Sequence, residues 1–287
     1  MTADGHRPPA VGLTDWRLPV TGPDALALAR DLGADGVQLD LGGPGRAPLL
    51  DAPGTLDAVR EAAAATGVRV LGLAANTLND IGLTAPAGGA DAARVRAVLT
   101  RLLDAASAVG APLVFVPSFR RSAIEDGAAL RRTAEVLAPV AAEAAARGLL
   151  LANENVLDGA RAAELVERVG SPAFRLLLDT HNPRAAGVDV PELLAAAGRH
   201  FADQIHLKDS AEPAAATAPM GGDGLVRQTL AALVRHRVPV RALVLENDYR
   251  DGDRARLAAD LAWARCQAAR PALAPEASPA HTDEVEA

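Results

Sequence analysis

The sequence predicts an α/β protein with one domain, a closed (β/α)8 barrel of the TIM type. Two observations carry this prediction. Eight short apolar runs alternate with helical segments almost from end to end of the 287 residues. Most of these runs are apolar without interruption, which is typical of parallel strands covered by helices on both faces. The length also suits the fold, because such barrels commonly reach about 250 residues.

The expected strands follow one another at the spacing of βα units. An open doubly wound sheet is the alternative fold, but the first expected strand lacks the GxGxxG turn that often follows there. We therefore favour closure into a barrel. The eight expected strands are residues 10–13, 36–41, 68–75, 112–118, 149–154, 174–179, 202–207 and 241–246.

The expected helices lie between these strands. Apolar residues recur at helical spacing, for example through residues 95–109. Pro23 and Pro191 stand where first-turn prolines belong, and Gly110 and Gly170 stand where helices should end. These signals support a helix after each strand.

The barrel is expected to occupy residues 1–270, and residues 271–287 form a tail of a different kind. The tail is rich in Pro and Ala, acidic and without an apolar period, so we expect it to be disordered. Within the barrel, residues 76–89 make a connection that is long for a βα unit. We expect this loop to border the mouth of the barrel as a lid or pocket wall.

Composition narrows the functional classes. No run approaches the roughly 18 uninterrupted apolar residues of a membrane span, and the N-terminus lacks the basic and apolar regions of a signal peptide. The net charge of −7 argues against a broad nucleic-acid surface. The single cysteine, Cys266, fits a reducing compartment. We expect a cytoplasmic protein whose partner is a small-molecule substrate, without nucleic acid or membrane, and we leave a homo-oligomer open.

Four possible metal ligands stand at the ends of the last four expected strands. These strands end in LANEN, LLLDTHNP, QIHLKD and LVLEND, which place Glu154, Asp179, His206 and Glu246 there. The carboxyl ends of all strands converge on one mouth of a barrel. Three carboxylates at one place raise each other's pKa values unless a cation lies between them. Oxygen ligands with one imidazole suit Mn²⁺, Mg²⁺ or Co²⁺, so we expect one divalent metal ion per chain.

Each of these residues alone is more often a strand-end cap or an ion-pair partner, and the set of four is what favours a metal site. Lys208 directly follows the strand of His206, where it is either a solvated surface lysine or a group that stabilises oxyanion charge. Asp209 has a supporting role in this interpretation. Trp16, at the end of the first strand, is either an apolar wall for a sugar ring or a structural tryptophan.

The motifs LANEN, LLLDTHNP, IHLKD, MGGDG and LVLEND, in this order, resemble the xylose-isomerase-like TIM barrels, most strongly over residues 149–247. This group holds sugar isomerases and epimerases, inosose and dehydroshikimate dehydratases, and endonuclease IV. The resemblance to its ketose 3-epimerases implies a metal held at the four strand-end positions and a substrate contact at Asn182. The second strand often carries a glutamate in this group, where this chain has Gln38. We place Gln38, and Asn76 at the start of the long loop, among the substrate-binding candidates.

The resulting prediction is a metal-dependent isomerase or epimerase of carbohydrate metabolism. Its substrate is a small polyhydroxy ketone or aldehyde, whose two adjacent oxygens chelate the metal as an enediolate forms. Glu154 and Glu246 remove and return the proton. The alternatives are a dehydratase that uses the same metal site and a non-catalytic barrel that binds a ligand. Endonuclease IV fits poorly, because it needs extra histidines and Asn182 stands where one is expected.

Overall fold

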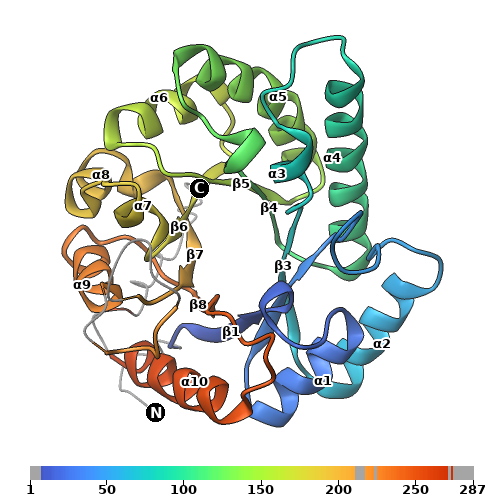
Figure 1. Cartoon of the computed structure of the whole chain (residues 1–287), viewed down its shortest axis with the longest axis vertical. Helices are drawn as coiled ribbons and strands as arrows, with labels where there is room; N and C mark the ends of the chain where they lie inside the picture. The colour runs from blue at the N-terminus through green and yellow to red at the C-terminus, as the bar shows by residue number, and fades with distance from the viewer. Residues whose placement is uncertain (1–7, 211–216, 223–224, 271–272, 274–287) are drawn as a thin grey trace, which may run out of the picture.

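The computed structural model describes residues 8–210, 217–222, 225–270 and 273. Within these residues, eight parallel strands form a closed barrel in sequence order, and β1 pairs with β8 to close it. Helices surround the strands as an outer ring (Figure 1). The predicted (β/α)8 barrel is therefore confirmed.

Each strand begins and ends within one residue of its predicted bounds. Continuous apolar runs mark buried parallel strands closely, because both faces of each strand are covered. The strands are β1 (Ala10–Thr14), β2 (Gly36–Asp40), β3 (Arg69–Ala74), β4 (Leu113–Pro117), β5 (Leu150–Glu154), β6 (Phe174–Asp179), β7 (Phe201–Leu207) and β8 (Ala242–Leu245).

The helices begin and end at the signals that the sequence carries. Pro23 and Pro191 lie in the first turns of α1 and α8, and Gly110 and Gly170 end α4 and α6 in the left-handed conformation. The helices are α1 (Pro23–Leu32), α2 (Thr55–Thr66), α3 (Leu78–Ile81), α4 (Ala90–Val109), α5 (Gly127–Ala146), α6 (Gly159–Val169), α7 (Asn182–Ala185), α8 (Val190–Ala197), α9 (Val226–Arg235) and α10 (Arg254–Ala268), with the 3-10 helices η1 (Asp15–Arg17), η2 (Arg120–Ser122) and η3 (Gly198–His200).

The interior of the barrel is packed and shaped by one strand irregularity. Between β2 and β3 the register shifts, so that Leu71 is an extra residue on β3. Its side chain fills the barrel close to Gly12 and Gly36. A Cβ at either glycine would lie 2.5 Å from the Leu71 side chain. The two glycines therefore make room for this bulge.

The connection 76–89 borders the mouth of the barrel, as predicted. Asn76 and Asn79 line the mouth cavity, whereas Leu78 and Ile81 of α3 are buried in the core. The loop is thus a packed wall whose polar side chains face the cavity. The predicted tail, 271–287, lies outside the described residues except for Leu273, and the domain boundary at residue 270 stays a prediction. No helix in the described part of the chain is long and apolar enough to cross a membrane.

Candidate active site and metal centre

The four predicted ligands come together at the carboxyl ends of β5, β6, β7 and β8. Each offers one ligand atom, and these atoms all lie within 4.8 Å of one another in a buried cluster. Three polar atoms there are buried without a hydrogen bond: His206 Nδ1, Asp179 Oδ2 and Glu246 Oε2. Buried polar atoms normally have hydrogen-bond partners, whereas the two carboxylate oxygens here have ion pairs with Lys208. Oxygens and one imidazole nitrogen that face a common point fit a divalent cation.

The outer atom of each carboxylate is held by a hydrogen bond, which turns the other oxygen inward. Asn182 Nδ2 donates to Glu154 Oε1, and Trp16 Nε1 donates to Glu246 Oε1, both at 2.9 Å. The Oδ1 of Asp179 accepts from two backbone N–H groups, those of His181 at 2.7 Å and Asn182 at 2.6 Å. These partners orient the ligands as outer-shell contacts do in metal sites.

A chain of amides fixes the tautomer of His206. Gln204 Nε2 donates to the Leu71 carbonyl at 2.7 Å, and Gln38 Nε2 donates to Gln204 Oε1 at 2.9 Å. The oxygen of Gln38 is thereby turned to His206 Nε2, 2.7 Å away. Since Gln38 Oε1 can only accept, Nε2 keeps its proton, and Nδ1, which faces the carboxylates, is the nitrogen that loses its proton to become a metal ligand.

Lys208 is the only lysine of the chain, and it is buried in this cluster. Its Nζ lies 3.2 Å from Asp179 Oδ2 and 3.1 Å from Glu246 Oε2. Burial alone would lower its pKa, but the carboxylates of Asp179, Glu246 and Glu154 outweigh burial and raise the pKa of Lys208. The side chain is therefore an ammonium buried among the carboxylates of the cluster, and it is not a solvated surface lysine.

The two glutamates have opposite protonation tendencies. Burial, together with the nearby Glu246 carboxylate, raises the pKa of Glu154 to about 7. Burial also acts on Glu246, but the cationic neighbours Lys208 and His206 lower the pKa of Glu246 well below its ordinary value. Paired groups whose environments separate their pKa values are suited to act as acid and base.

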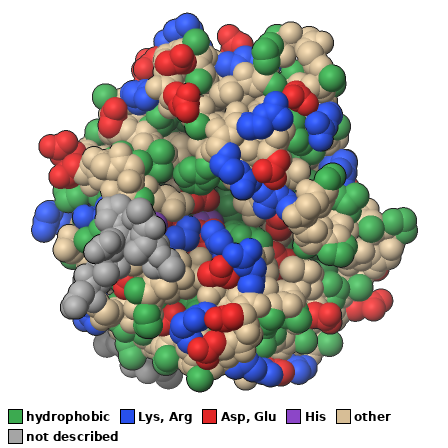
Figure 2. Space-filling view, in the orientation of Figure 1, with side chains coloured by type: hydrophobic (Ala, Val, Ile, Leu, Met, Phe, Trp, Pro, Cys, Tyr) green, Lys and Arg blue, Asp and Glu red, His purple; other side chains and the backbone are tan. Residues whose placement is uncertain are grey.

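A cavity of about 340 Å³ opens above this cluster at the mouth of the barrel. Its walls include Trp16, Asn76 and Asn182, and Glu154, Glu246 and Lys208 form its floor. Trp16 also stacks in a tilted arrangement on Phe115, with ring centroids 5.8 Å apart. Figure 2 shows Lys and Arg side chains gathered around the central hollow of this face. The size and polar lining suit a small polyhydroxy molecule.

Six of the nine predicted site residues line this cavity, whereas Asp179, His206 and Gln38 do not. Gln38 is fully buried beneath His206, so its position favours the orientation of the histidine over contact with substrate. Sequence reasoning missed Gln204, although it lies two residues before His206 and so shares its face of β7. It also missed Asn79 and the arginines of the cavity wall at positions 17, 46 and 250.

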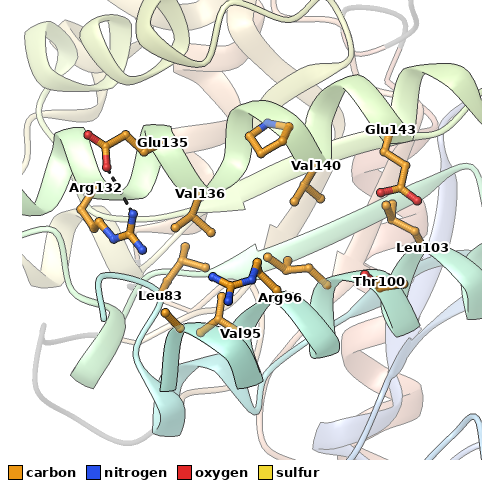
Figure 3. Close-up of a pocket in the computed structure, with 13 residues that line it drawn as sticks. Leu83, Val95, Arg96, Thr100, Leu103, Arg132, Glu135, Val136, Val140 and Glu143 are labelled. Carbon is orange, nitrogen blue, oxygen red and sulfur yellow. Dashed lines mark hydrogen bonds and ion pairs between the residues drawn. The ribbon is translucent and has the colours of Figure 1, made fainter. Parts of the chain in front are cut away.

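A second cavity, of about 260 Å³, lies outside the barrel between α4 and α5. Its lining is mostly apolar, with Val95 and Val136 among the side chains that face it, and the Arg132–Glu135 ion pair lies at one end (Figure 3). None of the four predicted metal ligands lines this second cavity. The mouth cavity is therefore the candidate active site.

Comparison with known proteins shows the family and the class of enzyme. The family model described as "Xylose isomerase-like TIM barrel" matches residues 26–266. A 2-epi-5-epi-valiolone 7-phosphate 2-epimerase from an Actinoplanes species is 55% identical over 256 residues, which cover 89% of this chain and 93% of that protein. The predicted enzyme of the isomerase and epimerase class is thus confirmed.

Solved structures with low sequence identity share the fold. D-psicose 3-epimerase with D-tagatose from Clostridium cellulolyticum H10 matches with a TM-score of 0.72 at 15% identity, covering 90% of this chain and 98% of that one. The IOLI protein with a zinc atom matches with a TM-score of 0.71 at 16% identity, covering 90% and 96%. With the family model and the 55% identical relative, these matches lead to one conclusion: the chain belongs to the xylose isomerase-like TIM barrel family.

Proposed function

We propose that this protein is a divalent-metal-dependent epimerase that inverts a carbon next to the ketone of a small polyhydroxy compound, with a cyclitol-type ring as the preferred class. The observation that carries the proposal is the set of four ligand atoms within 4.8 Å of one another, which includes Glu154 at the end of β5 and Glu246 directly after β8. The relative whose name is a valiolone 7-phosphate 2-epimerase supports this substrate class. Its name gives no support to the dehydratase alternative.

Glu154, Asp179, His206 and Glu246 would hold the metal. A bound divalent ion supplies a Lewis acid that polarises the substrate carbonyl and makes the neighbouring C–H more acidic. Three carboxylates and one imidazole are hard and borderline donors, which fits Mn²⁺, Co²⁺ or Mg²⁺.

The two glutamates move the proton. One carboxylate removes the proton next to the carbonyl, and the other returns a proton to the opposite face, which inverts the carbon. Asn182 and Trp16 hold the outer oxygens of Glu154 and Glu246, so both bases are fixed before substrate arrives. The ammonium of Lys208 stabilises the negative charge that develops on oxygen. Asn76 and the Trp16 ring position the substrate against the cavity wall.

The test is a comparison of Glu154→Gln with His206→Ala on 2-epi-5-epi-valiolone 7-phosphate. Glu154→Gln keeps an oxygen for the metal but loses the base, so the rate should fall roughly 10²- to 10⁴-fold while metal content changes far less. His206→Ala should lose metal first and regain activity in part with excess metal. Glu167→Gln, an exposed glutamate on α6, is the matched control. Wild-type rates in both site variants would refute the proposal.

A further inference from the structure

The mouth cavity carries positive charge that the proposed chemistry does not use. Among the described residues, four arginines line it, and we call them the mouth arginines: Arg17, Arg46, Arg120 and Arg250. They come from four different connections, those after β1, β2, β4 and β8. The chain as a whole has a net charge of −7, so this local excess runs against the overall charge.

Two of the mouth arginines share one carboxylate. Arg46 donates to Asp80 Oδ2 at 2.8 and 3.1 Å, and Arg120 Nη2 lies 2.7 Å from Asp80 Oδ1. Arg250 pairs with Asp248, its Nε 2.8 Å from Oδ1. One guanidinium of the Asp80 pair is therefore not neutralised by its partner.

Arg17 is the least satisfied of the four. Its nearest acidic atom is Glu246 Oε1, 3.7 Å from Nε, and Nε is buried without a hydrogen bond in the described part of the chain. The side chain is 30% exposed and lines the cavity. A buried guanidinium nitrogen that has a long ion pair but no hydrogen bond is free to donate to a ligand in the cavity.

The charges separate into an inner and an outer set. In the inner set, the three negative charges of the ligand carboxylates equal the one positive charge of Lys208 and the two of the proposed cation. The inner set therefore has no net charge. In the outer set, three mouth arginines pair with two carboxylates outside the metal cluster, Asp80 and Asp248. Among the described residues Arg17 has no ion pair outside that cluster. Two positive charges remain, and a phosphate monoester carries roughly −1.5 to −2 at pH 7.

We propose that the mouth arginines form a phosphate subsite, in which Arg17 binds the phosphate of a phosphorylated substrate directly and Arg46 and Arg120 supply further charge and donors. This inference rests on the proposed function, because it adds a phosphate monoester to the polyhydroxy ketone handled by the metal cluster. Arginine suits this task, because its planar guanidinium binds phosphate oxygens in a bidentate way. The backbone of Arg120 has φ +51, a conformation that is uncommon for a residue other than glycine.

The test measures kcat/KM of the metal-loaded full chain on 2-epi-5-epi-valiolone 7-phosphate and on the same compound after phosphatase treatment. The ratio of the two values isolates the phosphate from the chemistry of the ketone. Arg17→Gln should lower this ratio roughly 10- to 100-fold, the effect of one hydrogen bond to a charged group. The Arg46→Gln/Arg120→Gln double variant should lower it further. Arg60→Gln, which removes an exposed arginine of α2, should leave it unchanged.

Two results would overturn the subsite. One is equal turnover of both compounds by the wild type, and the other is a ratio that Arg17→Gln and the double variant leave unchanged. Binding of inorganic phosphate, measured by calorimetry, keeps the inference testable if neither compound turns over. In that case the proposed function fails, whereas the subsite stands if Arg17→Gln weakens phosphate binding at least about tenfold. Phosphate binding that does not depend on Arg17 contradicts the subsite.

Discussion

The Nε2 of His206 lies 2.7 Å from Oε1 of Gln38, and this contact decides which nitrogen of the histidine faces the carboxylates. If the amide of Gln38 rotated, it would lose its hydrogen bond to Gln204 Oε1. The amide of Gln204 is itself fixed by its hydrogen bond to the Leu71 carbonyl. The carbonyl of Leu71, at the bulge on β3, thus orients His206 on β7 through the side chains of Gln204 and Gln38.

Replacement of Gln38 by methionine should weaken metal binding. Methionine has a similar length but cannot accept the hydrogen bond from His206 Nε2, so the ring loses its orientation and tautomer. Loss of such outer-shell contacts typically costs 10- to 100-fold in metal affinity. Calorimetric titration with Mn²⁺ measures the effect, and Gln267→Met, a buried glutamine on α10, is the matched control. Equal affinities for both variants would show that Gln38 does not orient the histidine.

Metal affinity should rise with pH through about 7. Because burial raises the pKa of Glu154 to about 7, metal must displace a proton from this carboxyl at lower pH. His206, whose pKa the Glu246 carboxylate raises despite burial, adds a second proton in the same direction. The apparent dissociation constant should therefore fall roughly 10- to 100-fold per pH unit below pH 7.

The stability of the metal-free protein should fall as pH rises, whereas metal affinity rises. A folded-state pKa that lies above the ordinary value of 4.5 means that Glu154 stabilises the fold at low pH and that this contribution is lost as pH rises through about 7. Added metal should therefore raise Tm more at pH 8 than at pH 5.5. Calorimetric scans of wild type and Glu154→Gln check this, since the variant should show a smaller difference. A pH-independent metal effect in the wild type would contradict the assignment of Glu154 as a ligand.

Replacement of Lys208 by methionine should strengthen metal binding and reduce the rate. The ammonium lies 3.2 Å from Asp179 and 3.1 Å from Glu246, so its loss removes repulsion of a cation at the same place. A unit charge at this range changes binding by roughly tenfold or more. Lys208→Arg, which keeps the charge, is the comparison variant in the same Mn²⁺ titration. Weaker metal binding in Lys208→Met would show that the lysine supports the cation site.

Replacement of Asp260 by asparagine should destabilise the fold near the site. The carboxylate of Asp260 on α10 accepts from the Met220 backbone and the Tyr249 hydroxyl, each at 2.8 Å, and from Asn247 at 3.2 Å. An amide cannot accept from all three donors, and a buried unsatisfied donor costs about 1–3 kcal/mol. Urea unfolding measures the loss, with the exposed Glu61→Gln as control. A loss no larger than that of the control would contradict this role.

The sequence predicts the barrel and its ligands well because both depend on local patterns. Each parallel strand is buried on both faces, so an uninterrupted apolar run marks it, and the ligands stand at the ends of these runs. The helices α3 and α7 have only four residues each, which is too short for a helical period to appear. They fall inside segments that read as loops.

The residues that the sequence could not assign depend on distant pairing. Gln38 and Gln204 are 166 positions apart, and their hydrogen bond follows from closure of the barrel. Arg17, Arg46 and Arg250 stand in loops among many other arginines, so spacing does not distinguish them. The apolar character of Trp16 predicts a wall or a core position, but its donation to Glu246 follows from the pairing of β1 with β8.

The central claim is that a metal held by Glu154, Asp179, His206 and Glu246 supports removal and return of a proton next to a ketone. The most direct measurement is turnover of 2-epi-5-epi-valiolone 7-phosphate in deuterated water, followed by NMR. One deuterium should enter at the inverted carbon, a chelator should abolish its entry, and Mn²⁺, Co²⁺ or Mg²⁺ should restore it. Inversion without deuterium, or deuterium entry that the chelator leaves untouched, would contradict the claim.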